Sequence, residues 1–210
     1  MTPRTNQFSR EDIVDAAFAL VREHGWGGFS VQAIARAING STMPIYSHFA
    51  NVRDLEDAIC LKALEVLKGW MLEVRTGDVW IDHAINWVKF AEEERQLHQI
   101  LWDGRNVDLC MKCGEDINNF VATKLAGYAL FADLSSELVA EIRISRLLFA
   151  QKLAFWLNKD PNYLISKGIT CGTEEYIRRA SMAIYEGFRM QFREEKAGTG
   201  NESGRSSRTS

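Results

Sequence analysis

Residues 41–49, STMPIYSHF, decide how the first part of this 210-residue chain is understood. Ile45 and Phe49 lie four residues apart, so in a helix they share one face, which we expect to be buried. Pro44 then falls in the first helical turn, where its missing N–H costs little. The opposite face of this expected helix carries Thr42, Met43, Tyr46 and Ser47. Such a face suits hydrogen bonds to phosphates and base edges, and apolar contact with thymine methyl groups.

Two further helices are expected before this one, and each begins with a capping signal. Ser9 with Asp12 three residues later predicts the start of the first helix, which ends at Gly25. Ser30 predicts the start of the second, which Asn39-Gly40 ends. Three short helices with a tight turn between the last two are typical of a helix-turn-helix module.

Composition limits the remaining possibilities. The net charge is −3 and the pI is about 5.9, so contact with nucleic acid would need a local patch. The sequence has no membrane-length apolar run, no secretory signal and no disulfide-type spacing of its 4 Cys, so we expect a cytoplasmic protein without membrane partners. Only 3 Pro and long segments of helical period predict an all-α fold of about nine helices.

The expected organisation has three parts. Residues 1–54 form the helix-turn-helix domain, residues 55–196 a larger helical body, and residues 197–210, rich in Gly and Ser, a disordered tail. Beyond the module, a long helix is expected from Asn51, others near 78–103 and 106–132, one over 136–158, and a last one over 173–195.

The stretch from residue 14 to residue 59 resembles the N-terminal DNA-binding region of the TetR (tetracycline repressor) family, also described as AcrR-like. The matching residues include Ala16-Ala17, His24-Gly25, Phe29-Ser30-Val31, Ile34-Ala35 and Ile45-Tyr46-x-His48-Phe49. The resemblance covers about a quarter of the chain. It implies a transcriptional regulator, most often a repressor, in which the helix near Ser41 enters the major groove of a near-palindromic double-stranded DNA operator.

By this resemblance, phosphate contacts fall to Ser30, Tyr46 and His48, and base-reading positions to Thr42, Met43 and Ser47, with Ser41 at the start of the same helix. Arg53, also expected at the DNA interface, occupies a position that is usually basic in the family, at the start of the fourth helix. Two departures from the family pattern stand out. Asn39-Gly40 replaces the usual Gly followed by an aliphatic residue, and Lys or Arg is missing near Thr42. With five Arg against four acidic residues in residues 1–53, the module is near +1, which predicts weak non-specific binding and a modest dependence on salt.

The resemblance also implies that the larger body binds a small-molecule effector and forms a homodimer through its last two long helices. The expected pocket residues are Trp70, Met71, Trp87, Phe90, Trp102 and Phe120, which favour an apolar or aromatic effector. The expected interface residues are Leu138, Ile142, Phe149, Leu153, Ala180, Ile184 and Phe188.

Two alternatives remain open at this point. Cys110 and Cys113 form a CxxC pair, which in a regulator could sense thiol oxidation or form half of a metal site; no second half is evident, so no metal and no cofactor are expected. The low basic charge alternatively fits a helical interaction protein that has lost DNA binding. No phosphate loop, nucleophile elbow or HExxH motif is present, so we do not expect an enzyme.

Overall fold

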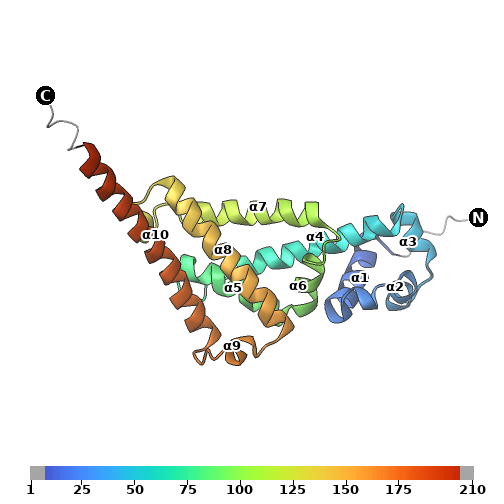
Figure 1. The fold of residues 1–210 in the computed structure, drawn as a ribbon. Helices are drawn as coiled ribbons and strands as arrows, with labels where there is room; N and C mark the ends of the chain where they lie inside the picture. Colours follow the sequence, from blue (N-terminus) through green and yellow to red (C-terminus); the bar gives the residue numbers. More distant parts are fainter. Residues whose placement is uncertain (1–7, 204–210) are drawn as a thin grey trace, which may run out of the picture.

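The structure is a computed structural model that describes residues 8–203, with side chains described for residues 8–193. Within this range all regular structure is helical and no strand occurs, which confirms the expected all-α fold (Figure 1). The helices are α1 Arg10–His24, α2 Val31–Ala37, α3 Met43–His48, α4 Val52–Met71, α5 Val79–Glu93, α6 Arg95–Leu101, α7 Val107–Lys124, α8 Ser136–Lys159, α9 Tyr163–Ser166 and α10 Thr173–Ser203, with 3-10 turns η1 Gly25–Gly28 and η2 Ala129–Phe131. No helix of residues 8–203 is both long and apolar enough to cross a membrane.

Local capping bonds fix the start of the first, second and fourth helices. Ser9 Oγ accepts the N–H of Asp12 at 3.1 Å, and the Asp12 carboxylate accepts the N–H of Ser9 at 2.8 Å, which completes a capping box. Ser30 Oγ accepts the N–H of Ala33, and Asn51 Oδ1 accepts the N–H of Asp54. Each bond satisfies an N–H that the helix itself leaves without a partner, so these helices begin where the sequence predicts.

The turn between α2 and α3 depends on both of its residues. Asn39 has a φ of 52°, a left-handed conformation that Asn tolerates better than most residues. Gly40 lies against Phe8, and a Cβ built on it would come within 2.8 Å of the Phe8 ring. The missing side chain therefore lets the segment before α1 pack onto the turn.

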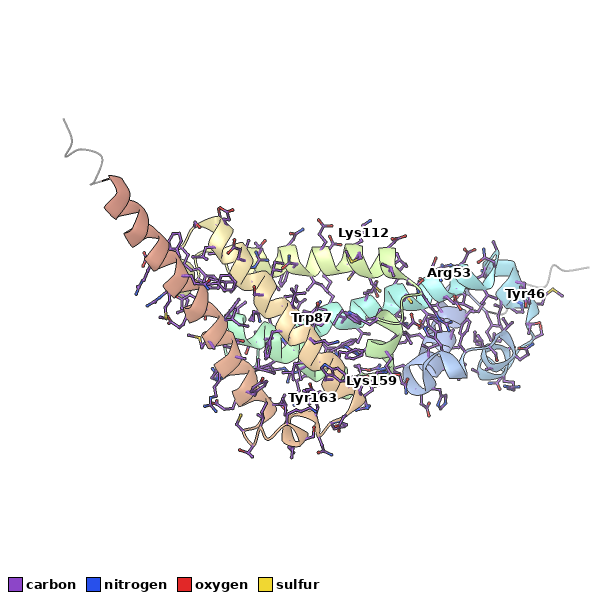
Figure 2. All side chains as sticks on the ribbon, viewed as in Figure 1. Tyr46, Arg53, Trp87, Lys112, Lys159 and Tyr163 are labelled. Atoms are coloured by element: carbon purple, nitrogen blue, oxygen red, sulfur yellow. The ribbon has the colours of Figure 1, made fainter. Side chains whose placement is uncertain are left out.

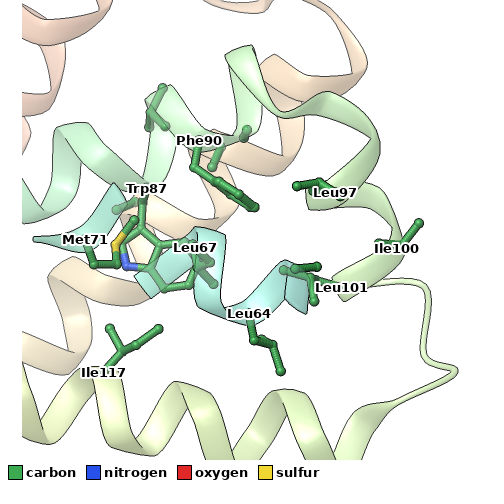
Figure 3. Close-up of a cluster of buried hydrophobic side chains, with 14 of the residues drawn as sticks. Leu64, Leu67, Met71, Trp87, Phe90, Leu97, Ile100, Leu101 and Ile117 are labelled. Carbon is green, nitrogen blue, oxygen red and sulfur yellow. The ribbon is translucent and has the colours of Figure 1, made fainter. Parts of the chain in front are cut away.

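Helix α4 joins the N-terminal module to the larger body. It packs on α1 in the module and on α5, α6 and α7 in the body (Figure 1). Figure 3 shows Leu64, Leu67 and Met71 of α4 between Trp87 of α5 and Ile117 of α7. All five side chains are buried, so α4 shares one continuous core with the body.

Helix α5 is the centre of the body. Eleven of its fifteen residues are buried, and it packs along α8 and also against α10. Trp80, Ile81, Ile85 and Phe90 are among the largest fully buried side chains of the described residues. A helix buried on nearly every side must be covered by its neighbours, which explains why α4, α6, α8 and α10 all contact it.

The structure differs from the expected helix pattern in three places. The segment near 78–103 is broken at Glu94, whose φ of −107° and ψ of 51° separate α5 from α6. The segment near 106–132 ends as α7 at Lys124, and the short helix α9 was not expected. Helix α10 continues to Ser203, past the expected end near 195 and into the predicted tail of residues 197–210, whose residues 204–210 lie outside the described range.

Candidate nucleic-acid interface and ligand cavity

Helix α3 has one buried and one exposed face. Ile45 and Phe49 are 2% and 4% exposed and pack into the core of the module. Met43 and Tyr46 are 76% and 61% exposed. Figure 2 shows Tyr46 at the end of the molecule opposite α10. The helical period of STMPIYSHF therefore separates the faces as expected, and its exposed face is open to a partner.

Two polar residues of this helix also form bonds within the module. Ser47 Oγ donates to the carbonyl oxygen of Pro44 at 2.8 Å. Nε2 of His48 lies 3.0 Å from the carbonyl oxygen of Phe8, which ties the end of α3 to the segment before α1. Ser47 is exposed and His48 is half-buried. His48 thus positions α3 as well as facing outward.

The residues at the starts of α2 and α3 are accessible to different degrees. Ser41 is exposed, and its Oγ accepts the N–H of Met43 at 3.4 Å, while Thr42 is half-buried. Ser30 is also half-buried, and because its hydroxyl accepts the N–H of Ala33, its own proton can still be donated to a ligand oxygen.

Arg53 lies in the first turn of α4, at the position expected, but its guanidinium is held by neighbours in the protein. Its Nε lies 3.1 Å from the Asp57 carboxylate, and a second nitrogen lies 3.8 Å from that of Glu56. It also donates to the carbonyl oxygen of Arg105. A contact between Arg53 and a DNA phosphate therefore has to compete with these three partners.

The N-terminal module is joined to the body by polar contacts around α6. Arg22 of α1 makes two hydrogen bonds to the carboxylate of Glu94, the residue at the break between α5 and α6. Arg105, in the loop after α6, places its guanidinium 5.2 Å from the Trp26 ring centroid and 3.6 Å from the Glu56 carboxylate. The orientation of the module thus depends on α6 and on the loop that follows it.

A cavity of about 730 Å³ lies in the body, bounded by residues of α4 to α8 and of the loop after α6. Trp87 and Trp102, two of the expected pocket residues, line it, and their rings meet edge to face at 5.5 Å. The lining residues are Leu64, Leu67, Trp87, Leu101, Trp102, Gly104, Val107, Cys110, Met111, Lys112, Gly114, Glu115, Asn118, Leu147 and Gln151. The volume and the mostly apolar wall suit a small organic molecule.

The other expected pocket residues lie elsewhere. Met71 and Phe120 line a separate cavity of about 420 Å³ between the end of α4, the start of α5 and the end of α7. Trp70 and Phe90 line neither of these two cavities and instead pack against each other, with ring centroids 6.5 Å apart. An aromatic residue at helical spacing does not by itself distinguish a core position from a cavity wall.

Several residues of the larger cavity were not expected from the sequence. Met111 and Asn118 on α7, and Leu147 and Gln151 on α8, line it. On each helix the lining residues follow helical spacing, as in Leu147 and Gln151, which are four residues apart. That spacing was present in the sequence, but it became meaningful only once these faces were known to lie opposite α4.

Two histidines of the body are buried. His98 stacks on Trp102 with ring centroids 5.0 Å apart, and burial, together with the nearby charge of Lys159, lowers its pKa to about 4. His83 lies on the wall of the smaller cavity, and its Nδ1 is 2.9 Å from a nitrogen of Arg146. The pKa of His83 is well below its usual value, chiefly because the ring is buried. Both rings are therefore neutral near pH 7.

Neither thiol of the CxxC pair is made more acidic by its surroundings. Burial raises the pKa of both Cys110 and Cys113, and it raises the pKa of neighbouring Cys60 to about 12. Cys110 lines the larger cavity and donates to the carbonyl oxygen of Leu101 at 3.1 Å, whereas Cys113 lines a different cavity. In the part of the chain that the structure describes, no group of three or more Cys, His, Asp or Glu could hold a metal ion.

The residues expected at the dimer interface separate into two groups. Leu138, Ile142 and Leu153 of α8 are 7%, 0% and 6% exposed, because they fill the core of the protomer itself and so offer almost no surface to a partner. The remaining four are half-buried: Phe149, Ala180, Ile184 and Phe188. Among the side chains described, the large apolar ones that are exposed on these two helices are Ile144, Leu148, Trp156 and Met190.

Comparison with known proteins agrees with this architecture. Residues 13–59 match the family model described as bacterial regulatory proteins, tetR family. No curated protein sequence matches the chain. Among solved structures, a transcriptional regulator from Rhodococcus sp. Rha1 is similar with a TM-score of 0.60 and 15% identity, over 87% of this chain and 95% of that one.

Two further solved structures have the same fold. A TetR variant from Acinetobacter baumannii AYE in complex with minocycline matches with a TM-score of 0.54 and 16% identity, over 88% of this chain and 98% of that one. The TetR family transcriptional regulator PfmR from Thermus thermophilus matches with a TM-score of 0.52 and 17% identity, over 85% and 98%. Residues 13–59 of this chain therefore match the tetR family of bacterial regulatory proteins, and the chain shares its fold with these solved TetR-family transcriptional regulators.

Proposed function

We propose that this protein is a homodimeric DNA-binding repressor that a small, largely apolar effector releases from its operator. The observation that carries the proposal is the exposed face of α3, where Met43 and Tyr46 face outward while Ile45 and Phe49 anchor the helix from behind. In this proposal residues 1–54 bind DNA, and residues 55–196 bind the effector and the second protomer.

In the proposed complex α3 enters the major groove. Met43 contacts bases, together with the neighbouring Thr42 and Ser47, while Tyr46 and Ser30 donate hydrogen bonds to phosphates. The module carries few cations, and the guanidinium of Arg53 is shared with acidic neighbours. Affinity then rests on hydrogen bonds and shape more than on charge, and we expect a shallow dependence on salt.

The loop between α6 and α7 provides a route from the cavity to the module. Trp102, Gly104 and Val107 of this loop region line the larger cavity. Arg105, between them, contacts Trp26 in the module and Glu56 on α4. A ligand that holds this wall in its present position therefore also holds the contacts that orient α3, and DNA in turn weakens ligand binding by the same factor.

The dimer proposal uses the exposed residues of the two long helices. Ile144 and Leu148 are 42% and 61% exposed on α8, and Met190 is 60% exposed on α10. Pairing these faces about a two-fold axis would cover apolar surface that the protomer leaves open and form a four-helix interface. It would also present two copies of α3 to half-sites about 34–36 Å apart on a near-palindrome.

The test is the selection of bound fragments from sheared DNA of the source organism by the purified protein, at two salt concentrations. We expect recovery of a near-palindromic sequence, and a weaker signal at every site for Tyr46→Phe. The matched control is Tyr163→Phe, which removes the same hydroxyl from a ring stacked on Trp156 in the body (Figure 2). Recovery of no common sequence at either salt concentration, or equal binding by both variants, would contradict the proposed role of α3.

A further inference from the structure

Two polar side chains face each other at the buried contact between α5 and α8. His83 of α5 is 4% exposed and Arg146 of α8 is 1% exposed. A terminal nitrogen of the Arg146 guanidinium lies 2.9 Å from Nδ1 of His83, and its other terminal nitrogen donates to the carbonyl oxygen of Trp80 at 2.8 Å. Such a pair is unusual in a core that is otherwise made of large apolar side chains.

This contact determines where the proton of His83 lies. A guanidinium has only donors, so Nδ1 of His83 must accept, and the neutral ring carries its proton on Nε2. That N–H is buried and has no hydrogen-bond partner among residues 8–193. The positive charge on the other side of the ring polarises the N–H and makes it a stronger donor.

The charge of Arg146 is also not paired with an anion at salt-bridge distance among the described residues. No salt bridge involving Arg146 occurs in the described part of the chain, and its Nε has no partner there. Its guanidinium lies 4.1 Å from the Trp80 ring centroid, and the charge of Arg143 also acts on it. Burial and then Arg143 lower the pKa of Arg146 to about 9, against the opposing charge of Asp78, so the guanidinium is still charged near pH 7 and is only partly compensated.

His83 lies on the wall of the cavity of about 420 Å³, and none of the other polar groups on that wall accepts a hydrogen bond from its Nε2. The Asp82 carboxylate accepts three backbone N–H groups of residues 75–77 and the Thr76 hydroxyl. The Glu73 carboxylate pairs with Arg75 at 2.6 Å. The Lys124 ammonium, also on the wall, lies 5.4 Å from the centre of the Phe120 ring. Both acidic groups are thus engaged, while the Lys124 cation and the His83 ring border the cavity.

We propose that this cavity binds a small organic carboxylate, whose carboxylate group accepts the N–H of His83 Nε2. The apolar part of the ligand packs against Met71, Val79, Phe120 and Val121, which form most of the remaining wall. The ligand places a negative charge on the Nε2 side of the His83 ring, and Arg146 lies on the Nδ1 side, so one imidazole ring separates the two charges. Calling this ligand an effector rests on the function proposed above, whereas the binding site itself does not.

The binding test uses two probes, octanoate and 4-phenylbutyrate, each compared with its primary amide. Binding is measured by calorimetry and by the ¹⁵N shifts of the histidine rings in the protein without DNA. We expect the carboxylates to shift Nε2 of His83 and leave His98 unchanged. We expect the amides to bind at least about tenfold more weakly, because a charged acceptor is the stronger partner. Equal affinity of acid and amide, or no shift at His83 with either acid, would overturn the proposal.

Variants separate a binding role from a packing role. Arg146→Met removes the charge but keeps most of the volume, and we expect it to fold and to lose carboxylate affinity by about tenfold or more. His83→Phe should abolish the preference of acid over amide. His98→Phe, a matched change at the other buried ring, should leave that preference unchanged. If Arg146→Met binds the acids as tightly as the unmodified protein, the pair has only a packing role and the proposal falls.

The two proposals can fail separately. Release of selected DNA by octanoate or 4-phenylbutyrate would identify the carboxylate as the effector. Carboxylate binding at His83 without any recovered operator would support the site and contradict the regulator function. A recovered operator with no carboxylate response at His83 would support the regulator function and overturn this site.

Discussion

The ion pair between Arg22 and Glu94 gives the most direct test of how the N-terminal module is held to the body. It joins α1 to the break between α5 and α6 through two hydrogen bonds, and the two residues are 72 positions apart in sequence. The Arg22 side chain is 49% exposed, whereas that of Glu94 is only 10% exposed. The two partners therefore depend on the pair to different degrees.

The unequal burial predicts unequal effects on stability. Arg22→Ala leaves a nearly buried carboxylate without its donor, which we expect to cost about 1.5–3 kcal/mol of unfolding free energy. Glu94→Gln leaves a guanidinium that water can solvate, so we expect a loss below about 1 kcal/mol. Since one partner is half exposed, the coupling energy from the double-variant cycle should be about 1 kcal/mol, the upper end of the range for exposed pairs.

The assay is urea unfolding of the two single variants and the double variant at one protein concentration, with m-values checked for constancy. The Lys62–Asp15 pair is the matched control, because it also joins two helices but is 34% and 63% exposed. Its coupling should stay below about 0.5 kcal/mol. A larger loss in Glu94→Gln than in Arg22→Ala, or a coupling no greater than that of Lys62–Asp15, would refute the view that Glu94 anchors the module.

Three further outcomes follow from packing, backbone conformation and protonation. Ile142→Ala, at a fully buried site, should lower the unfolding free energy by about 2–5 kcal/mol, whereas Ile165→Ala, at a site 68% exposed, should change it by less than about 0.5, both measured in urea. Asn39→Ala should lower the unfolding free energy by about 1 kcal/mol and Asn39→Gly should hardly change it, because Ala is strained at a φ of 52° and Gly is not. Thermal unfolding midpoints measure this difference. Burial and Lys159 lower the pKa of His98 to about 4, so the unfolded chain takes up a proton at this ring at a higher pH than the folded chain does. The unfolding free energy should therefore fall as the pH drops from about 6.5 to about 4. His98→Phe should flatten part of that fall, measured as urea midpoints over a series of pH values.

The parts of the structure that the sequence predicts well are those that depend on local spacing. The caps at Ser9, Ser30 and Asn51 each join residues three apart, and the buried pair Ile45 and Phe49 are four apart. Such signals need no knowledge of the rest of the fold, because the bond forms within one helical turn. The match of residues 13–59 to the family model rests on the same short-range pattern.

The parts that the sequence does not predict depend on which helix faces which. Helix α8 carries apolar residues on several sides, so its period could not show that Ile142 faces the core of the protomer while Ile144 and Leu148 face outward. The pairing of His83 with Arg146 joins residues 63 apart and leaves no local pattern. The exposed apolar residues of α8 and the contact beside the smaller cavity therefore became evident only from the packed structure.

The loop after α6 would make DNA and effector compete in the proposed regulator. The carbonyl oxygen of Arg105 accepts a hydrogen bond from Arg53, a residue that the family resemblance places at the DNA interface. If Arg53 turns to DNA, that carbonyl loses its donor, and the loop that carries Trp102 and Gly104 loses one of its contacts with α4. A ligand that fixes the loop in its present position keeps Arg53 engaged within the protein. Loop position would then link the two sites, and Arg53→Ala should weaken DNA binding and its response to the effector together.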